Sequence, residues 1–374
     1  VVIYNKRGIF MFKRIIIAML VLSLSAAFVS CDKKEKKQDD VPENNVVITE
    51  ETEGDIDYEE GLSTERYDGY EFRMLLRKGR LADQYLEEDS EDVVASAVYK
   101  RNKAVESKYG ITITATESSN SGWETDALNS ILAGDDAYDL VFAHSRAAFV
   151  YAINGAAYNI NDVEALHLDK PWWSKNIKEN CDVNGHLYVL DGDISTMGLA
   201  NAMVLFFNKN IFDELGYDYP YEMVRDGEWT FDEFAYYAKK GAADLDGNGI
   251  LESSVDQFGF GANGSWHAPI NIIYTGGQKI YDKTDDGLLE LSLYSNKTVD
   301  IYDEYFSLME NEACSPKMGI ADFKVGRLMM SAGSLGDAKA LRAMDDEFGI
   351  IPYPKFDEDD VYATAANGGT HLMI

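Results

Sequence analysis

Three polar residues follow directly after a segment with the composition of a buried strand. Residues 138–143 read Tyr-Asp-Leu-Val-Phe-Ala, and His144, Ser145 and Arg146 come next. Ligands of open α/β sheets bind beyond the carboxyl ends of the strands, so these side chains are candidates for contacting a polar solute. Together they can donate and accept hydrogen bonds with hydroxyl groups. The alternative for Arg146 is a surface salt bridge.

Two aromatic and two acidic residues further along the chain could complete such a site. Trp172 and Trp173 are adjacent and follow a proline, and one of them could stack on the apolar face of a sugar ring. Alternatively, both pack on the core of their own domain. Asp191 and Asp193 could accept hydrogen bonds from hydroxyl groups, or they could cap turns.

An acidic segment has the spacing of a calcium loop. Residues 244–252 read Asp-Leu-Asp-Gly-Asn-Gly-Ile-Leu-Glu, which is similar to the first nine positions of an EF-type loop. The candidate oxygen ligands are Asp244, Asp246, Asn248 and Glu252. The acidic residue of position twelve is missing, because Val255 stands there and Asp256 follows one residue later. The segment predicts either a structural calcium site or a polar turn.

Catalytic motifs are absent from the sequence. It has no nucleophile elbow, phosphate-binding loop or zinc-ligand spacing, and its five histidines are scattered. Carboxylate pairs carry no information in a chain with 65 acidic residues. The formal net charge of −31 would repel a phosphate backbone. We therefore expect no enzymatic activity, no nucleic-acid partner, and no cofactor other than a structural calcium ion.

The elements that must position these residues alternate between strand and helix. Residues 71–76, 111–114 and 138–143 are predicted strands, and helices are predicted between them because apolar residues recur at helical spacing and end at Gly110 and Gly134. This order predicts a doubly wound α/β domain. The same pattern recurs less regularly up to residue 334, and a length of 374 residues suggests two domains.

Several short segments then carry a family resemblance, in matching order from about residue 70 onward. Residues 138–146 resemble the strand-to-loop step of maltose-type binding proteins, and residues 185–189 and 205–209 resemble their "NGKLYA" and "LIYNK" strands. Residues 323–330 and 349–355 resemble their "F-x-x-G-x-x-x-M" step and "G-x-x-P-x-P" crossover. The chain is thus identified as a member of the extracellular solute-binding proteins, group 1.

The resemblance implies a two-lobed, type II periplasmic-binding-protein-like fold, with ligand in the cleft. Each lobe would be a doubly wound sheet with flanking helices. On that template lobe 1 is residues 66–195, lobe 2 is residues 196–347, and residues 348–374 return to lobe 1. Family members continue with further helices, so the C-terminal part is expected to be missing. A monomer that docks on ABC permease subunits is implied.

The resemblance also suggests roles for single residues. Arg146 matches an arginine that hydrogen-bonds sugar hydroxyls. Ser145 replaces an aspartate, which removes a bidentate acceptor and puts the identity of the ligand in doubt. Trp266, which follows Asn263-Gly264-Ser265, matches a stretch that supplies an aromatic platform in the second lobe.

The N-terminus has the features of an export signal. Lys13 and Arg14 precede an apolar run over residues 15–29, and Cys31 follows small residues. This resembles a lipobox, although Phe28 stands where Leu is usual, and an ordinary signal peptide is the alternative. We expect residues 1–31 to be an over-extended start plus signal and residues 32–65 to be a disordered acidic linker.

The sequence therefore predicts a lipid-anchored protein on the outer face of the cytoplasmic membrane, delivering a sugar or oligosaccharide to an ABC transporter. Two other functions stay open. One is a surface receptor or sensor of polar solutes without a transport partner. The other is an anchored enzyme that acts on polysaccharides, for which the sequence has no motif.

Overall fold

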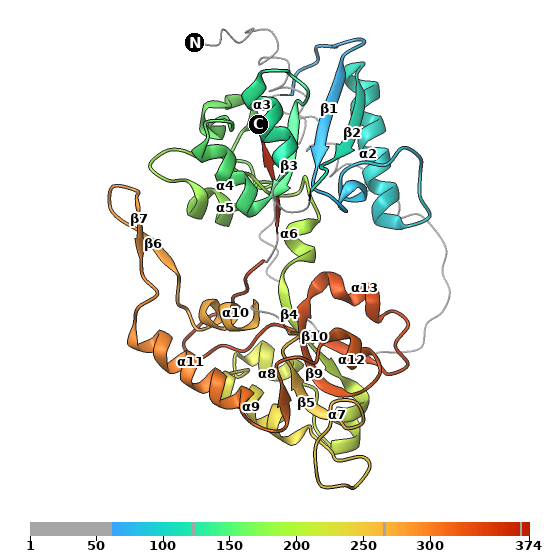
Figure 1. Ribbon diagram of the computed structural model, residues 1–374, viewed down its shortest axis with the longest axis vertical. Coiled ribbons are helices and arrows are strands. Elements are labelled where there is room, and N and C mark those ends of the chain that lie inside the picture. Colours follow the sequence, from blue (N-terminus) through green and yellow to red (C-terminus); the bar gives the residue numbers. More distant parts are fainter. Residues whose placement is uncertain (1–61, 121–123, 265–266, 367–368) are drawn as a thin grey trace. The chain divides into compact units, whose positions relative to one another are not determined.

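The computed structural model describes residues 62–120, 124–264, 267–366 and 369–374. The chain divides into two compact units, and each has its own sheet (Figure 1). Unit 1 extends to Thr196 and includes Thr370–Ile374, whereas unit 2 is Met197–Gly369. The α/β class expected from the sequence is confirmed. No helix among the described residues is long and apolar enough to cross a membrane.

Unit 1 is built on a four-stranded sheet in the order β11–β3–β1–β2. Its strands are β1 (Glu71–Leu76), β2 (Thr112–Glu117), β3 (Leu140–His144) and β11 (Thr370–Met373). β1 runs parallel to β2 and β3, and β11 runs antiparallel to β3. The sheet is therefore parallel except for the strand that enters from the C-terminal end of the chain.

The helices of unit 1 begin and end at the expected signals. They are α2 (Val93–Tyr109), α3 (Thr125–Ala133), α4 (Ser145–Ile153) and α5 (Lys175–Cys181). The carboxylate of Asp92 accepts hydrogen bonds from the backbone of Val94 and Ala95 and so caps α2. Gly110 ends the same helix at a φ of 68°, a conformation that glycine adopts without strain.

Both faces of the unit 1 sheet are buried under helices. Alternate residues of β1 enter different apolar clusters: Leu76 packs in one with Tyr109 of α2, and Leu75 packs in the other with Tyr151 of α4. This arrangement is the doubly wound lobe that the sequence predicts. It explains why the central strand β3 reads as a nearly continuous apolar run.

Unit 2 is built on a five-stranded sheet in the order β10–β4–β9–β5–β8. The strands are β4 (Met203–Asn208), β5 (Phe258–Gly261), β8 (Cys314–Ser315), β9 (Leu328–Ser334) and β10 (Phe348–Ile351), and a separate hairpin joins β6 (Tyr281–Lys283) to β7 (Leu289–Leu291). The helices are α6 (Met197–Ala200), α7 (Lys209–Leu215), α8 (Tyr221–Asp226), α9 (Phe231–Lys240), α10 (His267–Thr275), α11 (Asn296–Met309), α12 (Ile320–Lys324) and α13 (Ala338–Leu341).

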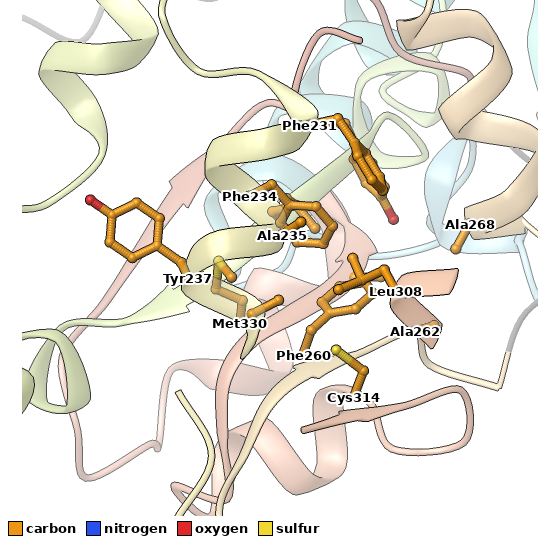
Figure 2. Close-up of a cluster of buried hydrophobic side chains, with 14 of the residues drawn as sticks. Phe231, Phe234, Ala235, Tyr237, Phe260, Ala262, Ala268, Leu308, Cys314 and Met330 are labelled. Carbon is orange, nitrogen blue, oxygen red and sulfur yellow. The ribbon is translucent and has the colours of Figure 1, made fainter. Parts of the chain in front are cut away.

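Aromatic side chains fill the core of unit 2. Phe234 of α9 meets Phe260 of β5 edge to face, with ring centroids 4.8 Å apart (Figure 2). Trp229 is fully buried, and its indole nitrogen donates to the carbonyl of Pro352 at 3.1 Å. These rings are structural, which accounts for part of the high aromatic content of the chain.

The point at which the chain returns to unit 1 differs from the expectation. The return was expected at residue 348, but β10 pairs with β4 of unit 2, with Phe348 opposite Asn208. Ile351 and Tyr353 are buried in the core of unit 2. Only Thr370–Ile374 belong to unit 1. The "G-x-x-P-x-P" segment is thus an edge strand of unit 2, because its apolar side chains complete that core.

The expected N-terminal segments lie almost wholly outside the described residues. This applies to the signal peptide, to Cys31 and to the linker up to residue 61. Leu62, which the sequence analysis assigned to the linker, packs against the core of unit 1.

Candidate functional site

The candidate site lies at the carboxyl ends of the parallel strands of unit 1. β3 ends at His144, and α4 begins at the next residue. In register, Leu76 pairs with Phe142, so Arg77 comes after the end of β1 at the same edge of the sheet. β11 places His371 opposite Ala143. Strands that are distant in sequence therefore bring polar side chains to one edge, as expected for a ligand site of an α/β sheet.

His144 is held in a fixed, uncharged state. Its backbone N–H donates to the carboxylate of the fully buried Glu124 at 3.1 Å. Its Nδ1 accepts from the backbone N–H of Arg146 at 3.2 Å, so the ring caps α4 and its proton lies on Nε2. Burial, together with the positive charges of Arg77 and Arg146, lowers the pKa of His144 to about 4. His144 can therefore offer one N–H donor at neutral pH.

Three arginines, Arg77, Arg80 and Arg146, lie near one another at this edge of the sheet. Arg146 is exposed in the first turn of α4, whereas Arg77 is half-buried. Burial lowers the pKa of Arg77, and the nearby charges of Arg80 and Arg146 lower it further. Arg77 was not predicted from the sequence, although its position directly after the predicted strand 71–76 was a usable signal. Ser145, the third predicted contact, is half-buried beside Arg146.

Asp191 also reaches this edge, by way of β11. Leu190 forms a β-bridge with Leu372, and the Oδ2 of Asp191 lies 3.9 Å from the Nδ1 of His371. Its Oδ1 accepts from the backbone N–H of Gly192 at 2.8 Å. Burial, and to a smaller extent the negative charge of Asp193, raises the pKa of Asp191 to about 6. The carboxylate is thus ionised at neutral pH in a largely dry environment.

Asp193 has a different setting from Asp191. Its side chain is exposed, and its backbone N–H donates to the carbonyl of Trp172 at 2.9 Å. Burial nevertheless raises its pKa. Asp193 therefore remains a candidate hydrogen-bond acceptor at the exposed rim of this group of polar side chains.

The structure does not place the two tryptophans in a ligand site. Trp172 and Trp173 are only 3% and 2% exposed, and both belong to the core of unit 1. The indole N–H of Trp173 donates to the carbonyl of Leu166 at 2.8 Å, and its backbone forms a bridge with Gly192. Stacking on a sugar would require an exposed ring face, so the packing alternative is the correct one. Trp266, the other predicted aromatic contact, lies outside the described residues.

The acidic loop forms a compact turn between α9 and β5. The carboxylate of Asp244 accepts from the backbone of Gly247 and Gly249, both at 2.7 Å. These bonds, that of Gly249 above all, lower the pKa of Asp244. Carboxylate oxygens of Asp244, Asp246 and Asp256 lie within 4.8 Å of one another.

This geometry alters the predicted ligand set. Asp256 is fully buried and supplies the acidic group that position twelve lacks. Glu252 is not part of the close group, and its carboxylate lies 3.4 Å from the Nδ2 of Asn248. The Oδ1 of Asn248 accepts from the backbone of Ile250 at 2.8 Å, as in a polar turn. The oxygen-only donor set nonetheless suits calcium.

Calcium is expected to raise the melting temperature of the protein, because an ion that binds only the folded state stabilises it. At one hundred times its dissociation constant, the gain is about 2.7 kcal/mol, which corresponds to several degrees for a protein of this size. Thermal denaturation with added calcium and with chelator measures the difference. Asp246→Asn should abolish the response. Identical melting temperatures for the wild type in both conditions would leave only the polar turn.

The sequence and fold agree with one protein family. The chain matches the model of the bacterial extracellular solute-binding proteins over residues 90–374. A comparison with curated proteins found no match to this sequence. The similarity between this chain and solved structures is accordingly a similarity of fold.

Three solved structures illustrate this similarity. An ABC transporter solute-binding protein from Agrobacterium radiobacter K84, in complex with ribitol, is 18% identical, with 83% of this chain and 72% of that chain covered and a TM-score of 0.50. The maltose/maltodextrin-binding domain from Bdellovibrio bacteriovorus, bound to maltotriose, is 17% identical over 81% and 71%, with a TM-score of 0.51. UgpB from Mycobacterium tuberculosis, in complex with glycerophosphocholine, is 16% identical over 82% and 69%, with a TM-score of 0.53.

These matches confirm the type II periplasmic-binding-protein-like fold that the sequence segments indicated. The polar edge of unit 1, where hydrogen-bond donors and acceptors surround the ends of β1 and β3, belongs to this fold. Since the family model covers well over half of the chain, this protein belongs to the family of bacterial extracellular solute-binding proteins.

Proposed function

We propose that the chain is an extracytoplasmic, lipid-anchored receptor that delivers a sugar or oligosaccharide to an ABC importer. The observation that carries this proposal is the mixed group of donors and acceptors at the carboxyl edge of the unit 1 sheet. Arg146 and His144 offer N–H donors, and Asp191 offers a carboxylate acceptor. Such a mixture suits hydroxyl groups, which both donate and accept.

The ligands of similar structures support a hydroxyl-bearing solute. Ribitol and maltotriose are uncharged and rich in hydroxyl groups, whereas glycerophosphocholine also carries charges. The partners proposed for this chain are the solute and ABC permease subunits, with the chain acting as a monomer that does not transform its solute. An orphan receptor remains the alternative function, and neighbouring permease genes would separate the two.

Replacing Arg146 with alanine is expected to weaken solute binding about ten- to a hundredfold, because a hydrogen bond to a charged group contributes roughly 1–3 kcal/mol. The melting temperature should stay unchanged, since Arg146 is exposed. Calorimetric titration with the sugar that binds the wild type measures the effect of Arg146→Ala. The same titration of Trp266→Ala tests the aromatic contact expected from the sequence. Arg225→Ala, an exposed change in unit 2, is the control. Wild-type affinity in Arg146→Ala would remove this residue from the site.

Cys31→Ser is expected to release the protein from the membrane, because the proposed diacylglyceryl group would have no acceptor sulfur. A lipid chain holds a protein on a bilayer through its buried methylene groups, so its loss should leave the protein in the soluble fraction. Fractionation of expressing cells measures this change. Ser30→Ala, which keeps the cysteine, is the control. A Cys31→Ser protein that still sediments with membranes would contradict lipid anchoring.

A further inference from the structure

His371 was not among the site residues predicted from the sequence, yet β11 places it in the candidate site. It is 8% exposed and stands opposite Ala143 of β3. The pairing of Leu190 with Leu372 fixes Asp191 beside it, and Asp191 is 7% exposed. The two side chains therefore face each other because of strand register, and not through a local sequence motif.

The two facing atoms are close without forming a hydrogen bond. The Nδ1 of His371 lies 3.9 Å from the Oδ2 of Asp191, beyond hydrogen-bond distance. Among the described residues, Nδ1 has no hydrogen-bond partner. The other oxygen of Asp191 is occupied by the backbone N–H of Gly192. A buried polar atom without a partner is destabilising, so a group that contacts both atoms would be favoured here.

The charges around this pair decide what kind of group fits. Burial lowers the pKa of His371 to about 4, and the pKa of Asp191 is raised to about 6. At neutral pH the imidazole is neutral and the carboxylate is ionised. An anionic group would be repelled by Asp191. The carboxylate 3.9 Å from Nδ1 favours the tautomer of His371 with its proton on Nδ1, and an ammonium group would leave that N–H without an acceptor. A hydroxyl donates to the carboxylate and accepts from the imidazole, so it satisfies both.

We propose that Asp191 and His371 together hold one hydroxyl group of a neutral solute, so that strand β11 contributes directly to binding. This inference rests on the proposed function as a solute receptor. It adds a contact that selects for a neutral, hydroxylated group at this point of the ligand. An ordinary structural contact between the two side chains is the competing explanation.

The hydroxyl contact makes binding depend on pH. Only the ionised carboxylate accepts the hydroxyl proton, so the apparent affinity should fall about tenfold between pH 7 and pH 5 for a group with a pKa near 6. Among the described residues, Asp193 acts electrostatically on Asp191, and His371 acts on His144, which Arg77 and Arg146 also influence; Glu124 acts on Arg77. His144, with a pKa of about 4, stays neutral over this range. Asp193 could contribute, and an Asp193→Asn variant controls for it.

The test is calorimetric titration of the full-length protein with four probes: ribitol, maltotriose, tagatose and glycerophosphocholine. Asp191→Asn should weaken binding of a neutral probe at least tenfold at pH 7 and flatten its pH profile. Asp193→Asn should keep the fall in affinity towards low pH but move its midpoint to lower pH, because the charge of Asp193 that helps to raise the pKa of Asp191 is removed. His371→Leu should also weaken binding at least tenfold, whereas His371→Asn should stay within about threefold of wild type, because the asparagine amide can replace the Nδ1–H donor.

The outcomes separate this inference from the proposed function. If a neutral probe binds and His371→Leu keeps wild-type affinity and pH profile, the pair is structural and the inference is overturned while the receptor function stands. Binding of glycerophosphocholine, whose phosphate and ammonium groups are charged, without binding of any probe that lacks charged groups would overturn the choice of an uncharged solute. If none of the probes binds the folded wild type, both the inference and the proposed sugar receptor fail.

Discussion

Replacing Asp139 with asparagine is expected to lower the free energy of unfolding by about 2–4 kcal/mol, because this change breaks a largely buried charge network. Asp139 precedes β3 and is 9% exposed. Its Oδ2 accepts from the backbone N–H and the Nε of Arg73 at 2.8 Å and 3.0 Å. Its Oδ1 accepts from the Nη2 of Arg73 at 3.0 Å and from the hydroxyl of Tyr70 at 2.6 Å. The network joins β1 to the start of β3, and denaturant unfolding measures its contribution.

Asp136 provides a matched control for this prediction. Its carboxylate lies 3.5 Å from the same Nη2 of Arg73, but its side chain is 87% exposed. Exposed ion pairs contribute little, so Asp136→Asn should change the free energy of unfolding by less than about 1 kcal/mol. Asparagine also tolerates the positive φ of 52° at this position. Equal effects of the two substitutions would show that burial does not decide the strength of this network.

Alanine at position 192 is expected to damage both the fold of unit 1 and the candidate site. Gly192 has a φ of +157°, and an added Cβ would lie 2.1 Å from the carbonyl oxygen of Trp172. Because that neighbour is backbone, the segment must shift, at a cost of about 1–3 kcal/mol. The shift would displace Asp191, whose Oδ1 accepts from the Gly192 N–H. We therefore expect solute affinity to fall at least tenfold, as measured by calorimetry beside thermal denaturation.

Gly155→Ala separates backbone strain from displacement of the site. Gly155 also has a positive φ, of +66°, but nothing lies within 4 Å of the added Cβ. The Gly155→Ala variant should lose about 1 kcal/mol of stability through backbone strain alone, and its affinity for the solute should be unchanged. If Gly192→Ala kept its affinity as well, the 191–193 turn would not belong to the binding site.

Local signals were sufficient to predict the first part of unit 1, from β1 through α2, β2 and α3 to β3. Helix α2 ends at Gly110 and α3 ends at Gly134, as expected from glycine after an apolar helical pattern. The strand predicted at residues 138–143 is β3, which begins two residues later than predicted and covers Leu140–His144. These features depend on neighbours in sequence, and such neighbours are visible without a structure.

Features that depend on distant neighbours could not be predicted in the same way. The apolar segment of β10 would suit any buried strand, and its pairing with β4 across the sheet is a tertiary choice. Two adjacent tryptophans cannot both be buried in a regular strand with one solvent face. Trp172 and Trp173 are nevertheless both buried, because that segment is irregular and forms only an isolated bridge.

The candidate site shows the same division between local and long-range information. His144 and Arg146 were identified because they follow a strand directly. His371 was missed because only the register of β11 against β3 places it beside Asp191. The segment 244–252 was predicted to be a candidate calcium loop from its spacing, but the close group of carboxylates contains Asp256 instead of Glu252, because Asp256 is buried beneath the turn.

The most direct test of the receptor function is thermal denaturation of the full-length protein across a panel of neutral sugars and sugar alcohols. A solute that binds only the folded state raises stability by about 2.7 kcal/mol at one hundred times its dissociation constant. We predict that at least one such solute raises the melting temperature by several degrees, and that Arg146→Ala and Asp191→Asn reduce that rise. A folded wild-type protein whose melting temperature responds to none of them would contradict the assignment as a sugar receptor.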